Sequence, residues 1–136
     1  SGVRMNLVDS SGWIEFFLAG PNGPLFKPVV EQRNILLVPV IALFEVHKVL
    51  IRKVPPDGVL ACLNVMRLGR VLDITDGRAV AAADTAARHR LAMADAMMYS
   101  MALEHGAMFW TQDVDYQGLP GVHYFPKPPK ASLPSV

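Results

Sequence analysis

The stretch that decides the fold is Asn6–Trp13, NLVDSSGW, close to the start of the sequence. Its first half, Asn6–Asp9, is a short apolar run that ends in an acid, which is typical of a buried strand. Ser10 or Ser11 is then expected to cap a helix that runs to about Leu18. A buried strand followed directly by a helix is the opening unit of an α/β fold with parallel strands.

Short hydrophobic strands and helices continue to alternate along the chain. Further strands are predicted at Ile35–Val38, Val71–Ile74, Ala107–Thr111 and Val122–Phe125. Further helices are predicted at Leu25–Gln32, from Pro39 to about Lys53, from Pro55 to the residue before Gly69, from a cap at Asp76 to about Arg90, and at Ala94–His105. This alternation predicts a mostly parallel five-stranded sheet with helices on both faces, and such sheets bind ligands at the carboxyl ends of their strands.

Composition limits the classes of function. The 136 residues suit one domain, and 51% hydrophobic with 18% charged residues supports a compact core. The formal net charge of +1 excludes a strongly basic, non-specific nucleic-acid binder, so any contact with RNA must come from local patches. The single cysteine, Cys62, is interpreted as a buried small hydrophobe and favours a reducing cytoplasm. No membrane segment is predicted, because the apolar run Ile35–Phe44 is too short and contains Pro39.

The ends of the chain are set apart from the predicted domain. Ser1–Arg4 precede the first methionine and are interpreted as a remnant of expression, so the fold prediction leaves them out. The domain is predicted to cover residues 5–125. The segment Pro126–Val136 is rich in proline and is expected to form an extended or loose tail.

Four acidic residues stand where an active site is expected. Asp9 closes the first predicted strand, and Asp113 follows the fourth. Both are therefore expected on the side of the sheet where ligands bind. Asp95 opens a helix, where the backbone dipole favours an acid. Glu45 interrupts the otherwise apolar helical stretch Val40–Val46, where an unpaired carboxylate is costly.

Each acid also has an explanation without a ligand. Asp9 could cap the helix that follows it, and Asp95 could complement a helix dipole. Asp113 could shape a turn, and Glu45 could pair with an arginine. Together, however, four carboxylates at one edge repel one another unless a cation lies between them. An all-oxygen site favours a hard divalent ion, Mg²⁺ or Mn²⁺.

Other chemistries have less support in the sequence. The four histidines show no metal-ligand spacing and there is no pair of cysteines, which argues against zinc. A serine nucleophile at Ser10 or Ser11 has no histidine partner in the sequence. Glu45, Lys48 and Arg52 fall on one side of their predicted helix. The two cations are therefore predicted either to contact phosphate or to form a solvated face with a weak ion pair.

These acids and their surroundings resemble the PIN-domain nucleases, and within them the VapC toxins of prokaryotic toxin–antitoxin pairs. The opening NLVDSSGW is similar to the family's first strand and first acid, and Pro39–Leu50 is similar to its second-acid helix. Leu91–Gly106 is similar to the third-acid helix, and Thr111–Tyr116 to a Thr-x-Asp-x-Asp-aromatic ending. Each motif is short, but all four stand in the family's order, and the resemblance runs from Met5 to about Phe125.

The resemblance implies a three-layer sandwich with strand order 3-2-1-4-5, in which Asp9 and Asp113 lie on adjacent strands. It implies an endoribonuclease that depends on Mg²⁺ or Mn²⁺ and acts on RNA, often tRNA or rRNA. It also implies a partner, a small VapB-type antitoxin whose C-terminal segment lies in a groove and blocks the site. A homodimer is expected as well, because Trp13–Phe26 and Val40–Val65 hold more apolar residues than a small core needs.

The hypothesis for function is therefore metal-assisted hydrolysis of RNA by the toxin of a type II pair. The residues predicted to hold one or two ions are Asp9, Glu45, Asp95 and Asp113, with Asp115 as a further candidate ligand or a structural residue. Asp113 is expected to be the primary ligand of this pair, because carboxylates two apart on a helical turn diverge by about 200°. Ser10 and Thr111 are expected to orient these ligands. The alternatives are a PIN-fold binding module without activity and, with less support, an aspartate-based phosphatase. The phosphatase motif would need a threonine two residues after Asp115, where Gln117 stands.

Overall fold

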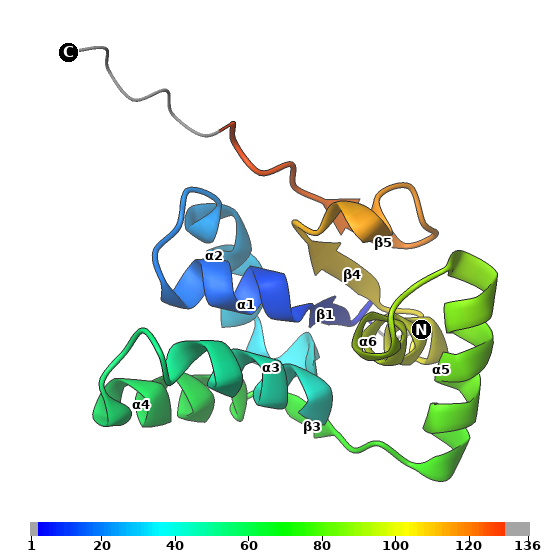
Figure 1. Cartoon of the computed structure of the whole chain (residues 1–136), viewed down its shortest axis with the longest axis horizontal. Helices are drawn as coiled ribbons and strands as arrows, with labels where there is room; N and C mark the ends of the chain where they lie inside the picture. Colours follow the sequence, from blue (N-terminus) through cyan, green and yellow to red (C-terminus); the bar gives the residue numbers. More distant parts are fainter. Residues whose placement is uncertain (1–2, 130–136) are drawn as a thin grey trace.

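A five-stranded sheet forms the centre of the protein in the computed structural model, which describes residues 3–129 (Figure 1). The strands are β1 (Asn6–Val8), β2 (Leu36–Pro39), β3 (Arg70–Leu72), β4 (Met108–Thr111) and β5 (Val122–Tyr124). All neighbouring strands pair in parallel, in the order β3-β2-β1-β4-β5. The predicted fold class and strand order are therefore confirmed.

Helices fill the connections between the strands and cover both faces of the sheet, with α5 packed against α6 (Figure 1). The helices are α1 (Ser10–Phe17), α2 (Gly23–Glu31), α3 (Val40–Leu50), α4 (Pro56–Met66), α5 (Asp76–His89) and α6 (Met93–Glu104), with the 3-10 turns η1 (Arg33–Ile35) and η2 (Val114–Tyr116). None of the described helices combines the length and the apolar character needed to cross a membrane.

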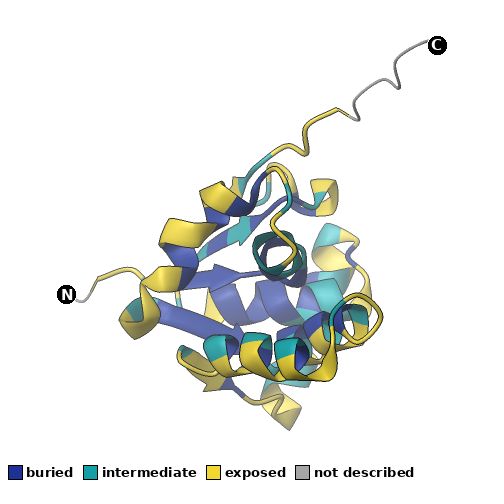
Figure 2. Cartoon of the chain, turned by 90° about the vertical axis from the view of Figure 1, so that its left-hand side faces the viewer, coloured by how far each residue is buried: buried dark blue, intermediate teal, exposed yellow. Residues whose placement is uncertain are grey.

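The central strands lie in the core, and the exposed surface is carried by the outer sides of the helices (Figure 2). Leu7 and Val8 of β1 are fully buried, as are Leu37 and Val38 of β2. Successive residues are buried because helices cover both faces, which explains why these strands lack a polar alternation. Burying each such side chain stabilises the fold by about 1.5–3 kcal/mol. The sheet therefore gives the residues at its carboxyl edge a rigid base.

Gly12 lets α1 approach its neighbours closely. A Cβ atom at this position would lie 2.6 Å from Cε1 of Phe26 and 2.7 Å from Cγ1 of Val8. Both neighbours are buried, so a side chain here would have to push α1 outward. Gly12 therefore fixes the depth of the turn that begins at Asp9.

The structure decides the cap of α1 and corrects that of α5. α1 is capped by Asp9, the alternative that the sequence offered beside Ser10 or Ser11, and its carboxylate accepts from the backbone N–H three residues along at 3.0 Å. α5 is capped by Thr75, whose hydroxyl accepts from the backbone N–H three residues along at 3.1 Å, and not by Asp76. Only the residue with extended backbone just before the first turn can reach that N–H group. An error of one residue in a predicted boundary therefore changes the cap.

Other boundaries differ from the prediction by a few residues. α2 begins two residues earlier than expected, at Gly23. Pro39 is the last residue of β2 instead of lying in the first turn of α3. α3 ends at Leu50, so Arg52 and Lys53 stand in the turn that follows it. Because this turn stays next to the helix end, its cations remain near the side of α3 on which they were predicted.

The two ends of the chain are described only in part. Residues 1–2 of the predicted remnant Ser1–Arg4, and residues 130–136 of the predicted tail, lie outside the described residues. The start of that tail contacts the domain, because the carbonyl oxygen of Pro126 accepts from Asn22 Nδ2 at 3.1 Å. Asn22 Nδ2 also donates to Gln112 Oε1 at 3.1 Å, next to the predicted site.

Candidate active site

A cleft of about 480 Å³ lies beside the carboxyl ends of β1 and β4, where the strand order reverses. Its charged lining consists of Asp9, Glu45, Lys48, Arg52, Lys53, Asp95 and Asp113. The four acids predicted from the sequence therefore share one cleft, although they come from four distant parts of the chain. Their roles stay a prediction.

Asp9 is the most deeply buried of these acids, with only 2% of its surface exposed. Its carboxylate accepts from Ser11 Oγ at 2.8 Å, from Thr111 Oγ1 at 2.7 Å and from the backbone N–H of Gly12 at 3.0 Å. Burial outweighs these donors and raises the pKa of Asp9 to about 7. A nearby cation would favour the charged carboxylate. The structure therefore holds Asp9 in place and leaves its charge sensitive to a bound ion.

Glu45 is half-buried on α3 and accepts from Ser10 Oγ at 2.7 Å. Within residues 3–129 it forms no ion pair, so the alternative of an arginine partner is not realised there. Ser10 and Thr111, which the sequence predicted as orienting residues, thus each donate to one of the acids. A hydroxyl donor of this kind fixes the rotamer of a carboxylate that is to bind a ligand.

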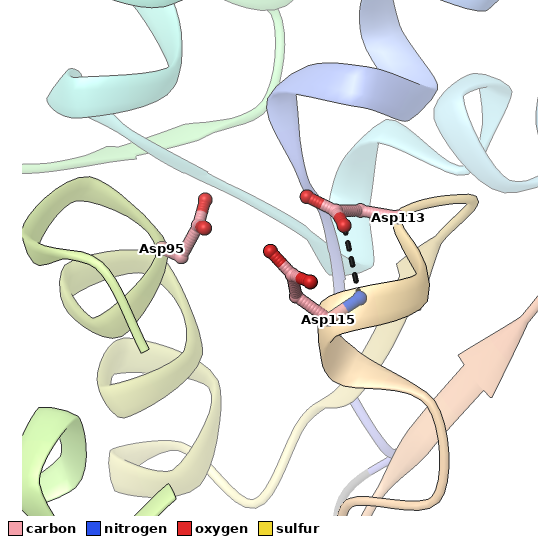
Figure 3. Close-up of side chains that lie close together, drawn as sticks. All are labelled: Asp95, Asp113 and Asp115. Carbon is pink, nitrogen blue, oxygen red and sulfur yellow. Dashed lines mark hydrogen bonds between the residues drawn. The ribbon is translucent and has the colours of Figure 1, made fainter. Parts of the chain in front are cut away.

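The tightest group of carboxylates consists of Asp95, Asp113 and Asp115, whose ligand atoms lie within 4.8 Å of one another. Figure 3 shows Asp95 on α6 facing the two other acids, which stand on the segment after β4. Asp9 and Glu45 lie outside this group. Three carboxylates at this spacing repel one another, and a hard divalent cation would relieve the repulsion.

Cations line the cleft beside these acids. Lys48 and Arg52 share its wall with Glu45, as their helical spacing indicated, and Lys53 joins them. All three cations are exposed, and within the described part of the chain none forms an ion pair. The cleft thus combines an acidic centre with free positive charge, but contact of these cations with phosphate stays a prediction.

Comparison with known families identifies this arrangement. The sequence model of the PIN domain family matches residues 7–121, which is most of the chain. The chain belongs to the PIN domain family. None of the curated proteins matches the sequence.

Solved structures share the PIN fold at low sequence identity. A toxin–antitoxin complex from Klebsiella pneumoniae superposes with a TM-score of 0.74 at 17% identity, covering 87% of this chain and 95% of that one. A DNA-bound VapBC from Salmonella typhimurium gives 0.69 at 17% identity, with coverages of 90% and 98%. VapC20 from Mycobacterium tuberculosis, a sarcin-ricin loop cleaving toxin, gives 0.66 at 17% identity, with 88% of each chain covered. At such identities the likeness shows the fold alone.

Asp113 and Asp115 both turn toward Asp95 in this PIN domain, which corrects the expectation that they diverge. That expectation placed both in one helical turn, where residues two apart point about 200° from each other. In the structure Asp113 has extended backbone and precedes η2, and its Oδ1 accepts from the backbone N–H of Asp115 at 3.0 Å. Both side chains therefore reach Asp95 (Figure 3). Asp113 lines the cleft, whereas Asp115 is exposed, and their relative importance stays a prediction.

Tyr116 adds a hydroxyl group next to Asp95. Burial raises the pKa of Asp95, which is half-buried. The Tyr116 hydroxyl lowers the pKa of Asp95, and the charges of Asp113 and other carboxylates raise it further. Tyr116 itself is fully buried, and its hydroxyl forms no hydrogen bond of standard geometry with the described residues. Burial and the charge of Asp9 raise the pKa of Tyr116, so this hydroxyl keeps its proton at neutral pH.

Several residues of the site were not assigned to it from the sequence. Ser11 could have been, because a hydroxyl two residues after an acid at a helix start readily reaches back to it. Lys53 was taken as the end of a helix. Phe44, which lines the cleft, carries no local signal, since only tertiary packing brings it to the acids. Tyr116 stands at the aromatic end of the motif Thr111–Tyr116, but its approach to Asp95 is likewise set by tertiary packing.

Proposed function

We propose that this PIN domain is a divalent-metal-dependent endoribonuclease and the toxin component of a type II toxin–antitoxin pair. The observation that carries the proposal is the approach of Asp95, Asp113 and Asp115 to within 4.8 Å, beside a cleft that Asp95 and Asp113 line together with Asp9 and Glu45. The resemblance of these motifs to the PIN-domain nucleases supports the same reaction here. The expected substrate is cytoplasmic RNA, with tRNA or rRNA as the first candidates.

The donor set fits Mg²⁺ or Mn²⁺. The acids that approach one another offer only carboxylate oxygens, the ligands that these hard ions prefer. Among the described residues no histidine or cysteine lines the cleft, which argues against zinc there. A divalent ion held by Asp95, Asp113 and Asp115 would lower the pKa of a water and neutralise charge on the phosphate.

The chain's own groups position the acids for this reaction. The Thr111 hydroxyl donates to Asp9 at 2.7 Å and accepts from the backbone N–H of Asp113 at 2.9 Å. One side chain therefore sets the positions of two acids on neighbouring strands. Lys48 and Arg52 line the α3 side of the cleft, where they can hold the phosphates of a bound strand.

The direct test is incubation of the purified protein with total RNA in Mn²⁺, in Mg²⁺ and in chelator. We expect defined RNA fragments with either ion and none with chelator. Asp95→Asn should remove cleavage, whereas Asp84→Asn, the same change at an exposed acid outside the cleft, should not. Cleavage that persists in chelator or in Asp95→Asn would contradict the proposal. Metal binding without cleavage of any RNA would favour the inactive binding module.

Metal binding is tested separately by calorimetric titration with Mn²⁺. We expect binding to the unmodified protein and its loss in Asp95→Asn. Asp9→Asn should also weaken binding, although Asp9 lies outside the tightest group of carboxylates. Unchanged binding in both variants, with both still folded, would remove the metal site from the proposal.

A small antitoxin and a second copy of the chain are the proposed partners. The first is supported by the neighbours solved as toxin–antitoxin complexes. Apolar surface is available for both partners: one groove of about 320 Å³ lies among α1, α2 and α4, and a second of about 240 Å³ lies between α3 and α4. We expect the chain to be toxic when it is expressed alone, a small protein encoded beside its gene to relieve this toxicity on coexpression, and the two proteins to copurify. Light scattering should show a dimer of the free chain.

A further inference from the structure

The cleft holds an aromatic side chain that a metal site does not need. Phe44 of α3 lines the cleft next to Glu45, and 62% of its surface is exposed. Every other Phe, Trp and Tyr among residues 3–129 is buried or half-buried. Leaving such a ring in water forgoes about 1.5–3 kcal/mol of burial free energy. Its position in the wall of the acidic cleft therefore points to a ligand that covers it.

Cations accompany Phe44 along the same wall. Lys48 and Arg52 follow it by four and eight residues, which places the three side chains on one side of α3 and its following turn. Lys53 also lines the cleft. In the part of the chain that the structure describes, these cations have no carboxylate partner within ion-pair distance. The wall thus presents one apolar ring beside unpaired positive charge.

We propose that Phe44 is a substrate-binding residue of this wall: one base of the bound RNA strand stacks on its ring, and the neighbouring phosphates are held by Lys48, Arg52 and Lys53. The inference rests on the proposed nuclease function and names the residue that holds a base of its substrate. A base can cover an aromatic ring only when its face is free, which excludes bases stacked within a duplex. Stacking tolerates every base, so the wall would select unpaired strands more than particular sequences.

The two walls of the cleft then have complementary tasks. The acids around Asp95 repel phosphate unless a cation lies between them. The α3 wall attracts phosphate without a metal and orients the strand through the stacked base. A strand held on α3 would therefore meet the acids with one phosphate at the proposed metal position, which is the arrangement that cleavage within an unpaired region requires.

The test measures RNA binding apart from cleavage. Fluorescence anisotropy is recorded in Ca²⁺ with three labelled probes: a single RNA strand of about ten nucleotides, the same strand in a duplex, and the matching DNA strand. A gel checks that the RNA stays intact during the measurement. Phe44→Ala should weaken single-strand binding about fivefold or more, the loss of one stacked base, and Phe44→Trp should stay within about twofold of the unmodified protein. Ile51→Ala is the matched control, because Ile51 is 56% exposed near the end of α3 but lines a different groove.

The outcomes separate this inference from the proposed function. Binding that depends on Phe44 without any RNA cleavage would support the inference and remove the nuclease proposal. Cleavage and binding that are equal in Phe44→Ala and in the unmodified protein would support the nuclease proposal and overturn the inference. Equal weakening of duplex and single strand would also overturn the inference. So would a change of oligomeric state in Phe44→Ala, since it would assign the ring to a contact between copies.

Discussion

The two walls of the cleft are built by different physical means. On the strand side, the carboxylate of Asp9 is buried and accepts from Ser11 and Thr111 at 2.7–3.0 Å. On the α3 side, Phe44 and Lys48 are exposed, and the lysine forms no ion pair within residues 3–129. The strand side, called the rigid wall below, has its geometry before any ligand arrives. The exposed side chains on the α3 side, called the mobile wall below, must lose rotamer freedom on binding. We infer that the acids, Glu45 of α3 among them, serve the chemistry and that the exposed side chains of α3 hold the substrate.

The largest effect is expected from neutralising an acid next to the rigid wall. Asp113→Asn should reduce RNA cleavage by about a thousandfold or more, while the fold persists. Asp115→Asn should leave a measurable rate, because Asp115 is exposed and does not line the cleft. Initial rates with labelled RNA and thermal unfolding of both variants check this. If the order is reversed at equal stability, Asp115 is the more important ligand.

The buried charge on the rigid wall predicts a pH dependence of stability without metal. The pKa of Asp9 rises from 3.8 to about 7 on folding, so the native state binds more protons between these pH values. Asp9 therefore makes its full contribution to the free energy of unfolding below about pH 4. This contribution is lost as the pH rises through 7, by at most on the order of 4 kcal/mol. Denaturant unfolding in chelator should show this loss, and Asp9→Asn should reduce it. An identical pH profile in Asp9→Asn would refute the assignment.

A smaller effect is expected when the rigid wall loses a hydrogen bond but keeps its charges. Thr111→Val preserves the shape of a fully buried side chain and removes the hydroxyl that joins Asp9 to the backbone of Asp113. Losing such an orienting group should lower activity or metal affinity about 10- to 100-fold. Ser100→Ala, which removes a buried hydroxyl on α6 outside the cleft, is the control. Equal activity of both variants would show that the rigid wall does not need this bond.

The smallest effects are expected on the mobile wall. Lys48→Ala and Arg52→Ala should each weaken RNA binding a few-fold and leave the cleavage rate at saturating RNA nearly unchanged. Each should lower the slope of log affinity against log salt by about 0.7, the value for one phosphate contact with a single strand. Lys27→Ala, on exposed α2 surface where Lys27 pairs with Glu31 at 3.8 Å, serves as control. A loss of catalytic rate without weaker binding would move these cations into the chemistry.

The sequence predicted the rigid wall better than the mobile one. An acid just after an apolar run marks the carboxyl end of a buried strand. Asp9 and Asp113 could therefore be placed at the carboxyl ends of β1 and β4 from local pattern alone. Glu45 was found because a carboxylate within an apolar helix is unusual. These signals are strong because each rests on a few adjacent residues.

The mobile wall gave a weaker signal for a physical reason. α3 reads VIALFEVHKVL, and its apolar residues lie on nearly every side, so periodicity does not reveal that Phe44 faces the cleft. The approach of Asp115 to Asp95 was also missed, since it depends on the extended backbone of Asp113 just before η2. Exposure and side-chain direction of this kind are set by tertiary packing, which a single sequence does not display.

The order of the strands also bears on how the protein is made. β4 lies between β1 and β5 in the sheet, yet it is the fourth strand to leave the ribosome. While synthesis proceeds at about 5–20 residues per second, β1, β2 and β3 can pair before Asp113 exists. The nascent chain therefore carries Asp9 and Glu45 without the acids that they are to meet. The proposed substrate is RNA, and the ribosome is surrounded by it during synthesis. The acidic site of the nascent chain stays incomplete until β4 pairs with the open edge of β1.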